Sequence, residues 1–410
     1  MNIPVSVTSE VGRLQAVLLH RPGRELESLT PQYLDSMLFE DIPFLEQMKE
    51  EHDNFARTLI SQGCEVLYVE SLLEEVFCDQ ALRTKAIEYL VSSSHLISPS
   101  LREIIRGFLT EKSASQLVAC CIAGVLKSDI DEYVTQKTLS YYIRDAFPYY
   151  IAPLPNLYFT RDPATAVGSG ISVNLMKTES RRRENWLVSQ IFCHHPRFQN
   201  VRVYQDYTSE SSIEGGDILI LNERSIIIGS SARTDVWAIE SFARKMLKPA
   251  DEGGEGFKEV LVIQIPFTRA YMHLDTVFTM VDVDSFCLFA GIESKLRVFR
   301  LTLGKGDTLH ISQQKDLRSA LKKSLNTGSV HLIKSGGDDA IVSAREQWND
   351  STNTLAVAPG TIITYKRNIV SNETLSRHGI TVIPVGGSEL VRGRGGPRCM
   401  SMPLAREPLS

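Results

Sequence analysis

Short runs of valine, isoleucine and leucine alternate with longer amphipathic stretches along most of the 410-residue chain. The clearest example begins at Asp217 with DILIL, a turn and IIIGS, and continues through a polar segment to VWAIESFARKML and EVLVIQIP. Short apolar runs are typical of buried strands, whereas the longer stretches have the period of a helix. The pattern therefore predicts the order strand, strand, helix, strand.

This unit recurs about five times, although residue identity between the copies is low. The other copies begin at Leu14, near Tyr158, at Thr276 and at Leu355. Each copy carries a polar segment at the equivalent position, so five units around one axis would gather five polar loops at one mouth. A doubly wound open sheet shows a similar alternation, and the pattern alone leaves both α/β architectures open.

One stretch, from about residue 74 to 142, interrupts the repeat and contains no predicted strand. It has helical periodicity in four segments: QALRTKAIEYLVSS, SPSLREIIRGFLT, SASQLVACCIAGVL and SDIDEYVTQKTL. Serine or aspartate stands at the expected helix starts, where its side chain can cap free backbone N–H groups. We therefore predict a single α/β domain over residues 1–410 that carries an inserted helical subdomain at residues 74–147.

Composition narrows the class of protein. Hydrophobic residues make up 43% and charged residues 23% of the chain, as in a soluble globular protein, and the formal net charge of -5 disfavours nucleic-acid binding. The longest apolar run, LVACCIAGVL, is shorter than the roughly 20 residues that span a bilayer. The first residues lack the pattern of a signal peptide. We therefore expect a cytoplasmic protein without nucleic-acid or membrane partners.

The seven cysteines are expected to be thiols, because their number is odd and their spacing is irregular. Six have apolar or helical surroundings and are expected to be buried. Cys399 instead lies in the glycine-rich segment RGRGGPRC, which contains Arg392, Arg394 and Arg398. Such an electropositive setting is expected to lower the pKa of the thiol, as a nucleophile requires. An arginine–glycine RNA-binding tail is disfavoured, since the motif occurs once in an acidic chain.

Three further segments place polar groups where a strand meets a loop. They are NLYFTRDP with Asp162, EGGD with Glu214, and HLD with His273 and Asp275. Strand alternation would put His273 and Asp275 on one face. Each segment also has a plain structural interpretation: a turn aspartate, a flexible glycine turn and a core histidine.

Together these segments supply a thiol, a histidine, several carboxylates and several arginines, without a metal-binding motif or a nucleotide-binding loop. Two carboxylates can hold a planar guanidinium through paired hydrogen bonds. A thiolate can attack its central carbon, and arginines can bind a carboxylate at the far end. This combination suits arginine as substrate, and we expect no cofactor and no metal.

The chain resembles the arginine deiminase family of bacterial type, within the guanidino-group-modifying (pentein) superfamily. The resemblance covers essentially the whole chain. It rests on SEVGRLQAVLLHRPGRELE, FTRDP, EGGD, MHLDTVFTMVD, AREQWNDSTNTLAVAPG and GRGGPRCMSMPLAR. It implies a catalytic domain built as a five-bladed, pseudo-symmetric α/β propeller of ββαβ units. The helical insertion is the feature that marks deiminases of this type.

The resemblance also implies roles for individual residues. Cys399 would attack the guanidinium carbon to form a covalent amidino intermediate, and His273 would protonate the departing ammonia and then activate water. Asp162 and Asp275 would hold the guanidinium, and Glu214 would support the site through the substrate or His273. The residues expected to bind the rest of the substrate are Asn156, Phe159, Arg181, Arg233 and Arg394. For Arg181 and Arg233, a solvated surface role is the alternative.

The expected reaction is hydrolysis of L-arginine to L-citrulline and ammonia. Related enzymes that act on agmatine or methylarginine, or that transfer the amidino group, are the alternatives, as is a non-catalytic arginine-binding protein on the same fold. The family's habit also leads us to expect a homo-oligomer.

Overall fold

The computed structural model describes residues 4–94, 98–134, 148–205 and 211–409. Five of the six sheets in this described part share one plan, in which a central strand pairs antiparallel with one neighbour and parallel with the other. In sheet order, the strands are β5 (Ala164–Val167), β6 (Gly170–Val173) and β7 (Val203–Gln205); β8 (Ile218–Asn222), β9 (Ser225–Ser230) and β10 (Glu259–Gln264); β11 (Phe278–Asp282), β12 (Ser285–Leu288) and β15 (His331–Lys334); β16 (Leu355–Ala358), β17 (Thr361–Tyr365) and β18 (Thr381–Val385); and β19 (Met402–Arg406), β1 (Leu14–Leu19) and β2 (Glu65–Tyr68).

A helix leads from each central strand to its parallel neighbour, because parallel strands need a long crossover connection. The crossover helices, in the same order, are α7 (Arg182–His194), α8 (Val236–Leu247), α9 (Leu317–Leu325), α11 (Ile369–Arg377) and α1 (Leu45–Ser61). Helix α8 has the bounds predicted from its periodicity. The repeated order of strand, strand, helix and strand is thus present, in a mixed α/β fold.

Two pairings were not predicted. In the unit that begins at Leu14, the sequence pattern indicates no first strand before Leu14. The structure supplies this strand as β19 from the other end of the chain, antiparallel to β1. The hairpin of β13 (Arg297–Leu303) and β14 (Leu309–Gln313) was also missed, and it adds two strands to the edge of the sheet that contains β10. The segment RVFRLTL at residues 297–303, which contains the β-branched Val298 and Thr302 and the aromatic Phe299, was a signal for it.

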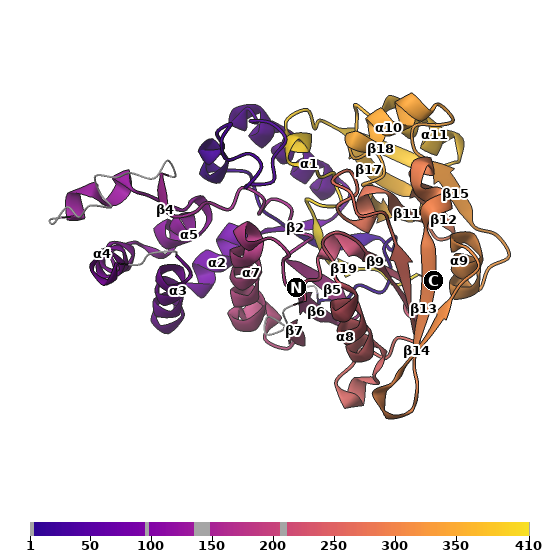
Figure 1. Cartoon of the computed structure of the whole chain (residues 1–410), viewed down its shortest axis with the longest axis horizontal. Coiled ribbons are helices and arrows are strands. Elements are labelled where there is room, and N and C mark those ends of the chain that lie inside the picture. Colours follow the sequence, from indigo (N-terminus) through magenta and orange to yellow (C-terminus); the bar gives the residue numbers. More distant parts are fainter. Residues whose placement is uncertain (1–3, 95–97, 135–147, 206–210, 410) are drawn as a thin grey trace.

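A group of helices occupies the chain between β2 and β5, at one end of the molecule (Figure 1). It comprises α2 (Val69–Val76), α3 (Gln80–Ser93), α4 (Pro99–Thr110) and α5 (Ala114–Ala123), followed by the short strands β3 (Val125–Leu126) and β4 (Tyr149–Ile151). The predicted caps are confirmed for three of the four segments, since Asp79, Ser98 and Ser113 each accept a hydrogen bond from the first turn of a helix, whereas no side chain caps the 3-10 helix that begins at Ser128. The segment SDIDEYVTQKTL forms a 3-10 helix over Ser128–Tyr133, and its last residues lie outside the described part.

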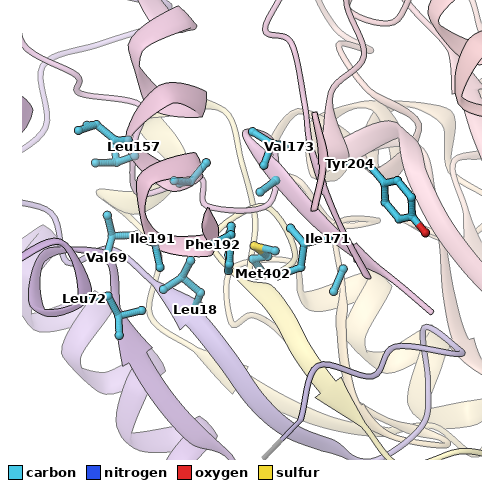
Figure 2. Close-up of a cluster of buried hydrophobic side chains, with 14 of the residues drawn as sticks. Leu18, Val69, Leu72, Leu157, Ile171, Val173, Ile191, Phe192, Tyr204 and Met402 are labelled. Carbon is cyan, nitrogen blue, oxygen red and sulfur yellow. The ribbon is translucent and has the colours of Figure 1, made fainter. Parts of the chain in front are cut away.

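The largest hydrophobic core joins the helical group to the strands. Figure 2 shows Leu18 of β1, Val69 of α2, Ile171 of β6, Phe192 of α7 and Met402 of β19 gathered in one cluster. No helix among the described residues is long and apolar enough to cross a membrane. No disulfide links cysteines in the described part of the chain, but the expectation of burial is wrong for Cys78 and Cys193, which are exposed, and Cys120 is only half-buried.

Candidate active site

The predicted segments converge on one cavity at the ends of strands from different sheets. Glu214 and His273 each stand directly before a short 3-10 turn, Gly215–Asp217 and Leu274–Thr276 respectively. Asp162 precedes β5, and Cys399 lies between the 3-10 turn Leu390–Gly393 and β19. Predicted site residues that line the cavity are Asn156, Phe159, Asp162, Arg181, Arg233, His273, Arg394 and Cys399. Leu38 and Met272 also line it and were not predicted.

The strand geometry expected for His273 and Asp275 is wrong, because residues 274–276 form a 3-10 turn and β11 begins only at Phe278. Asp217 accepts a hydrogen bond from the backbone N–H of Leu274 at 2.8 Å, and the Thr276 hydroxyl donates to the His273 carbonyl at 2.7 Å. These bonds stabilise the turn. The sequence predicted His273 and Asp275 as site residues, but a 3-10 turn, and not the alternation of a strand, positions their side chains.

His273 forms a buried pair with Glu214, with 2.7 Å between Nε2 and Oε2. Its Nδ1 lies 3.8 Å from Oδ1 of Asp162. Burial on its own would lower the pKa of His273, but the charge of Asp162 and the bond to Glu214 outweigh it and raise the pKa to about 9. Burial opposes ionisation of Glu214, whose pKa nevertheless falls to about 2 because of His273. At neutral pH the site therefore holds an imidazolium ion beside two carboxylates.

Cys399 is 3% exposed, and its sulfur lies 3.5 Å from Oδ2 of Asp275. Burial raises the pKa of this thiol well above its usual value, and the charges of Asp275, Asp162 and Asp350 raise it further. The expectation that neighbouring arginines lower this pKa is therefore wrong.

The reason is that the three arginines have other partners. Arg398 donates to Asp275 at 2.8 Å and to Glu10 at 3.2 Å, and Arg392 pairs with Asp41 and Glu389. The guanidinium of Arg394 lies over the ring of Trp348, 3.5 Å from its centroid. Their charge is thus directed to these groups and not to the thiol.

Asp275 and Asp162 offer carboxylate oxygens close to the sulfur. Oδ1 of Asp275 is buried and has no hydrogen-bond partner among the described residues, while Oδ2 accepts from Arg398. Oδ1 of Asp162 accepts from the backbone N–H of Gly216 at 3.2 Å, and Oδ2 accepts from Arg181 at 2.8 Å. A buried acceptor without a donor is costly unless a ligand supplies one, so the free oxygen of Asp275 favours a ligand rich in N–H groups.

The arginines of the cavity differ in their partners. Arg181 is enclosed by Glu184 and Asp162, with its Nη2 2.8 Å from Oε2 of Glu184. Arg233 donates to the Thr178 hydroxyl and the Met272 sulfur, and no carboxylate in the described part of the chain forms an ion pair with it. Both are nearly buried, so a solvated surface role does not apply to either. Arg233 is the cation best placed to bind an anionic group of a ligand.

The remaining predicted residues shape the wall of the cavity. Asn156 donates from Nδ2 to the carbonyl oxygen of Met37 at 2.7 Å, which ties its loop to the segment that carries Leu38. Phe159 is buried against Tyr158, with ring centroids 3.9 Å apart. Among the described residues, the one cluster that could hold a metal ion is Asp162, Glu214 and His273, whose donor atoms lie within 4.8 Å of one another.

The family model for arginine deiminase matches residues 35–406. The chain belongs to the arginine deiminase family. An arginine deiminase of Bacillus cereus is 46% identical over 99% of this chain and 100% of its own length. One from Latilactobacillus sakei is 43% identical over the full length of both chains.

Solved structures share the fold of this arginine deiminase family member at low identity. The amidinotransferase SxtG of Microseira wollei matches with a TM-score of 0.56 at 12% identity, covering 99% of both chains. The N-terminal domain of the cyanobacterial arginine dihydrolase ArgZ matches with a TM-score of 0.55 at 12% identity, over 96% of this chain and 99% of that one. A dimethylarginine dimethylaminohydrolase matches with a TM-score of 0.50 at 15% identity, over 95% and 99%.

Proposed function

We propose that the protein hydrolyses L-arginine to L-citrulline and ammonia, with Cys399 as the nucleophile. The observation that carries this proposal is a buried thiol 3.5 Å from one carboxylate group, in a cavity that is also lined by Arg233 and by His273, the partner of Glu214. The full-length similarity to arginine deiminases supports the same substrate.

Binding of the guanidinium prepares the thiol. A planar cation between Asp162 and Asp275 donates N–H bonds to both carboxylates, including the free Oδ1 of Asp275. It also neutralises two of the charges that raise the pKa of Cys399. The substrate itself therefore favours the thiolate form, which is the form that reacts.

The thiolate then donates an electron pair to the guanidinium carbon and forms a C–S bond. As one C–N bond breaks, His273 gives its proton to the leaving nitrogen, which departs as ammonia and leaves an amidino thioether on Cys399. The neutral His273 next takes a proton from water, whose oxygen adds to the same carbon. The C–S bond breaks, the thiolate returns, the remaining proton of the added water passes to solvent, and citrulline is released.

The far end of the substrate carries an α-carboxylate. Arg233 binds it in this proposal, because no carboxylate of the described residues forms an ion pair with its guanidinium. Arg181 assists from its position against Asp162 and Asn156. Phe159 packs beside the aliphatic part of the substrate, and Arg394 closes the cavity above it.

The proposal also includes the arrangement of the sheets and the inserted helices. The five similar sheets form the five blades of a pseudo-symmetric propeller around the cavity, in one domain over residues 1–410. The helices α3–α5 belong to an inserted subdomain at residues 74–147, and α2 (Val69–Val76) leads into it. A cytoplasmic location and a homo-oligomeric state also remain predictions.

The first experiment measures citrulline and ammonia released from L-arginine by the wild type and by Cys399→Ala, with and without EDTA. We expect equal amounts of both products from the wild type, unchanged by EDTA, and a rate at least about 10⁴-fold lower in the variant. Cys78→Ala, which removes an exposed thiol, is the matched control and should retain full activity. Faster turnover of agmatine or methylarginine than of arginine, or arginine binding without ammonia release, would refute the proposal.

A further inference from the structure

Asn353 contacts the nucleophile and has no role in the reaction described so far. It lies in the turn between α10 (Ala340–Trp348) and β16, within the motif AREQWNDSTNTLAVAPG, and is completely buried. Its Nδ2 lies 3.1 Å from Sγ of Cys399. Its Oδ1 accepts the backbone N–H of the same cysteine at 3.0 Å. One side chain therefore contacts both the backbone and the sulfur of Cys399.

The two contacts fix the orientation of the amide. A backbone N–H can only donate, so the side-chain atom that it meets must be the carbonyl oxygen Oδ1. The NH₂ group then faces the sulfur, and it also lies 3.3 Å from the carbonyl oxygen of Asp275. Asn353 is thus a hydrogen-bond donor to Sγ, whichever protonation state Cys399 adopts.

The surroundings of the sulfur explain why a neutral donor is useful here. Three carboxylates disfavour the thiolate, and a hydrogen bond to the charged form counteracts them. A cationic donor would do the same but would repel the guanidinium of the substrate. An amide stabilises the thiolate without adding charge. The backbone N–H of Gly396 acts in the same direction and lowers the pKa of Cys399.

The glycine-rich segment leaves room for this contact. A Cβ atom on Gly396 would lie 2.8 Å from both Cβ and the carbonyl oxygen of Asn353, and 2.9 Å from its Oδ1. The absence of a side chain at Gly396 therefore allows the segment that carries the nucleophile to pack directly on Asn353.

We propose that Asn353 is a catalytic residue that donates a hydrogen bond to the Cys399 thiolate and holds its sulfur in position for attack. This inference rests on the proposed function. The bond is strongest when the sulfur is charged, which occurs before attack and again when the C–S bond of the amidino thioether breaks. Asn353 thus stabilises the same thiolate as nucleophile and as leaving group.

The test compares the wild type with Asn353→Asp, which keeps an oxygen for the backbone N–H but replaces the donor by a carboxylate oxygen. Asn353→Ala removes the donor without adding charge and replaces the first variant if that one does not fold. The control is Asn372→Asp, a partly buried amide that bonds Tyr365 and Thr364, away from the sulfur.

The first measurement is the rate at which iodoacetamide alkylates Cys399 in substrate-free protein at pH 8, followed by mass spectrometry of its peptide. We expect this rate to fall about 10- to 100-fold in either Asn353 variant, because a hydrogen bond to a charged group is lost. The kcat for arginine should fall at least as much, with KM changed less than about threefold. Asn372→Asp should change neither rate.

An unchanged alkylation rate in a folded Asn353 variant would overturn the proposal, even if kcat fell, because the residue would then only support the structure. The alkylation readout needs no turnover. A wild type that releases no citrulline would therefore refute the proposed function and leave the comparison of thiol reactivity valid.

Discussion

His273 has a protonation state that burial alone does not explain, whereas burial by itself already favours the neutral form of Cys399. Burial disfavours the charged form of both, yet the pKa of His273 is raised to about 9. The carboxylates Asp162 and Glu214 stabilise its positive charge, and the same class of neighbour disfavours a negative charge on Cys399. A site lined by carboxylates therefore keeps a general acid charged and a thiol neutral until a cationic substrate arrives.

The raised pKa of His273 predicts how kcat/KM changes at alkaline pH. His273 must be protonated to release ammonia, so kcat/KM should fall as pH rises through about 9, the pKa of His273 in the free protein. Glu214→Gln removes a hydrogen-bonded charge that raises this pKa, and should move the fall at least one pH unit lower. The measurement is citrulline release across pH 6–10.

The control for this profile is Glu223→Gln, which changes an exposed carboxylate. A profile that is flat to pH 10, or one that Glu214→Gln leaves in place, would contradict the assignment of His273 as the acid.

At the scale of elements, the segment between the 3-10 turn Leu390–Gly393 and β19 controls the position of the nucleophile. Arg394 adopts a left-handed conformation with φ of 64°, uncommon for a residue with a side chain. The glycines beside it pack against aromatic rings. A Cβ on Gly393 would lie 2.1 Å from the Tyr158 hydroxyl, and one on Gly395 would lie 2.2 Å from a ring carbon of Phe159.

We therefore expect Gly395→Ala to displace this segment from Phe159 and lower kcat/KM for arginine by about 10- to 100-fold, because small misplacements of reacting groups are costly. The Tm should fall by only a few degrees, since the change lies at one surface of the segment. Steady-state kinetics and thermal unfolding measure the two effects.

Gly107→Ala in α4 is the matched control, because a Cβ there meets no atom within 4 Å. It should retain activity and raise stability by up to about 1 kcal/mol, as alanine favours the helix. Wild-type kinetics in Gly395→Ala would show that the close contact with Phe159 does not position the nucleophile.

At the scale of the whole molecule, the two ends of the chain meet behind the active site. β19 follows Cys399 and pairs with β1, and Glu10 accepts hydrogen bonds from Arg398 at 3.2 and 3.3 Å. Burial disfavours the charge of Glu10, but Arg398, Arg161 and Arg406 outweigh it and lower its pKa to about 2. The N-terminal segment thus helps to fix the residue next to the nucleophile.

Glu10→Gln should destabilise the fold, because it removes one negative charge from among the buried Arg398, Arg161 and Arg406. We expect a loss of about 3–5 kcal/mol in the free energy of unfolding at pH 7, measured by urea denaturation. The folded-state pKa of Glu10 lies below its unfolded value of 4.5, so its contribution is complete above about pH 4.5 and is lost as pH falls through about 2.

The difference between variant and wild type should accordingly shrink at pH 3. Glu27→Gln, at an exposed position, should change stability by less than about 0.5 kcal/mol. A loss at pH 7 no larger than that of Glu27→Gln would mean that Glu10 does not hold the two ends together.

Local patterns in the sequence predicted most of the helices and strands and, together with the family resemblance, named several residues of the site. The bounds of α3 and α8 and the caps Asp79, Ser98 and Ser113 follow from periodicity and from side chains that reach their own helix. The motifs around Asp162, Glu214, His273 and Cys399 likewise named residues that the fold brings together. These signals lie within a few residues of one another, so the sequence carries them directly.

The tertiary structure decided what depends on distant contacts. β19 joins β1 from the opposite end of the chain, which no local period can indicate. Asp275 and Asn353 lie 124 and 46 residues from Cys399 in sequence, yet they contact its sulfur. The arginines adjacent to Cys399 in sequence bond to other groups. Burial and these long-range neighbours determine the pKa of a thiol, and they arise only when the chain folds.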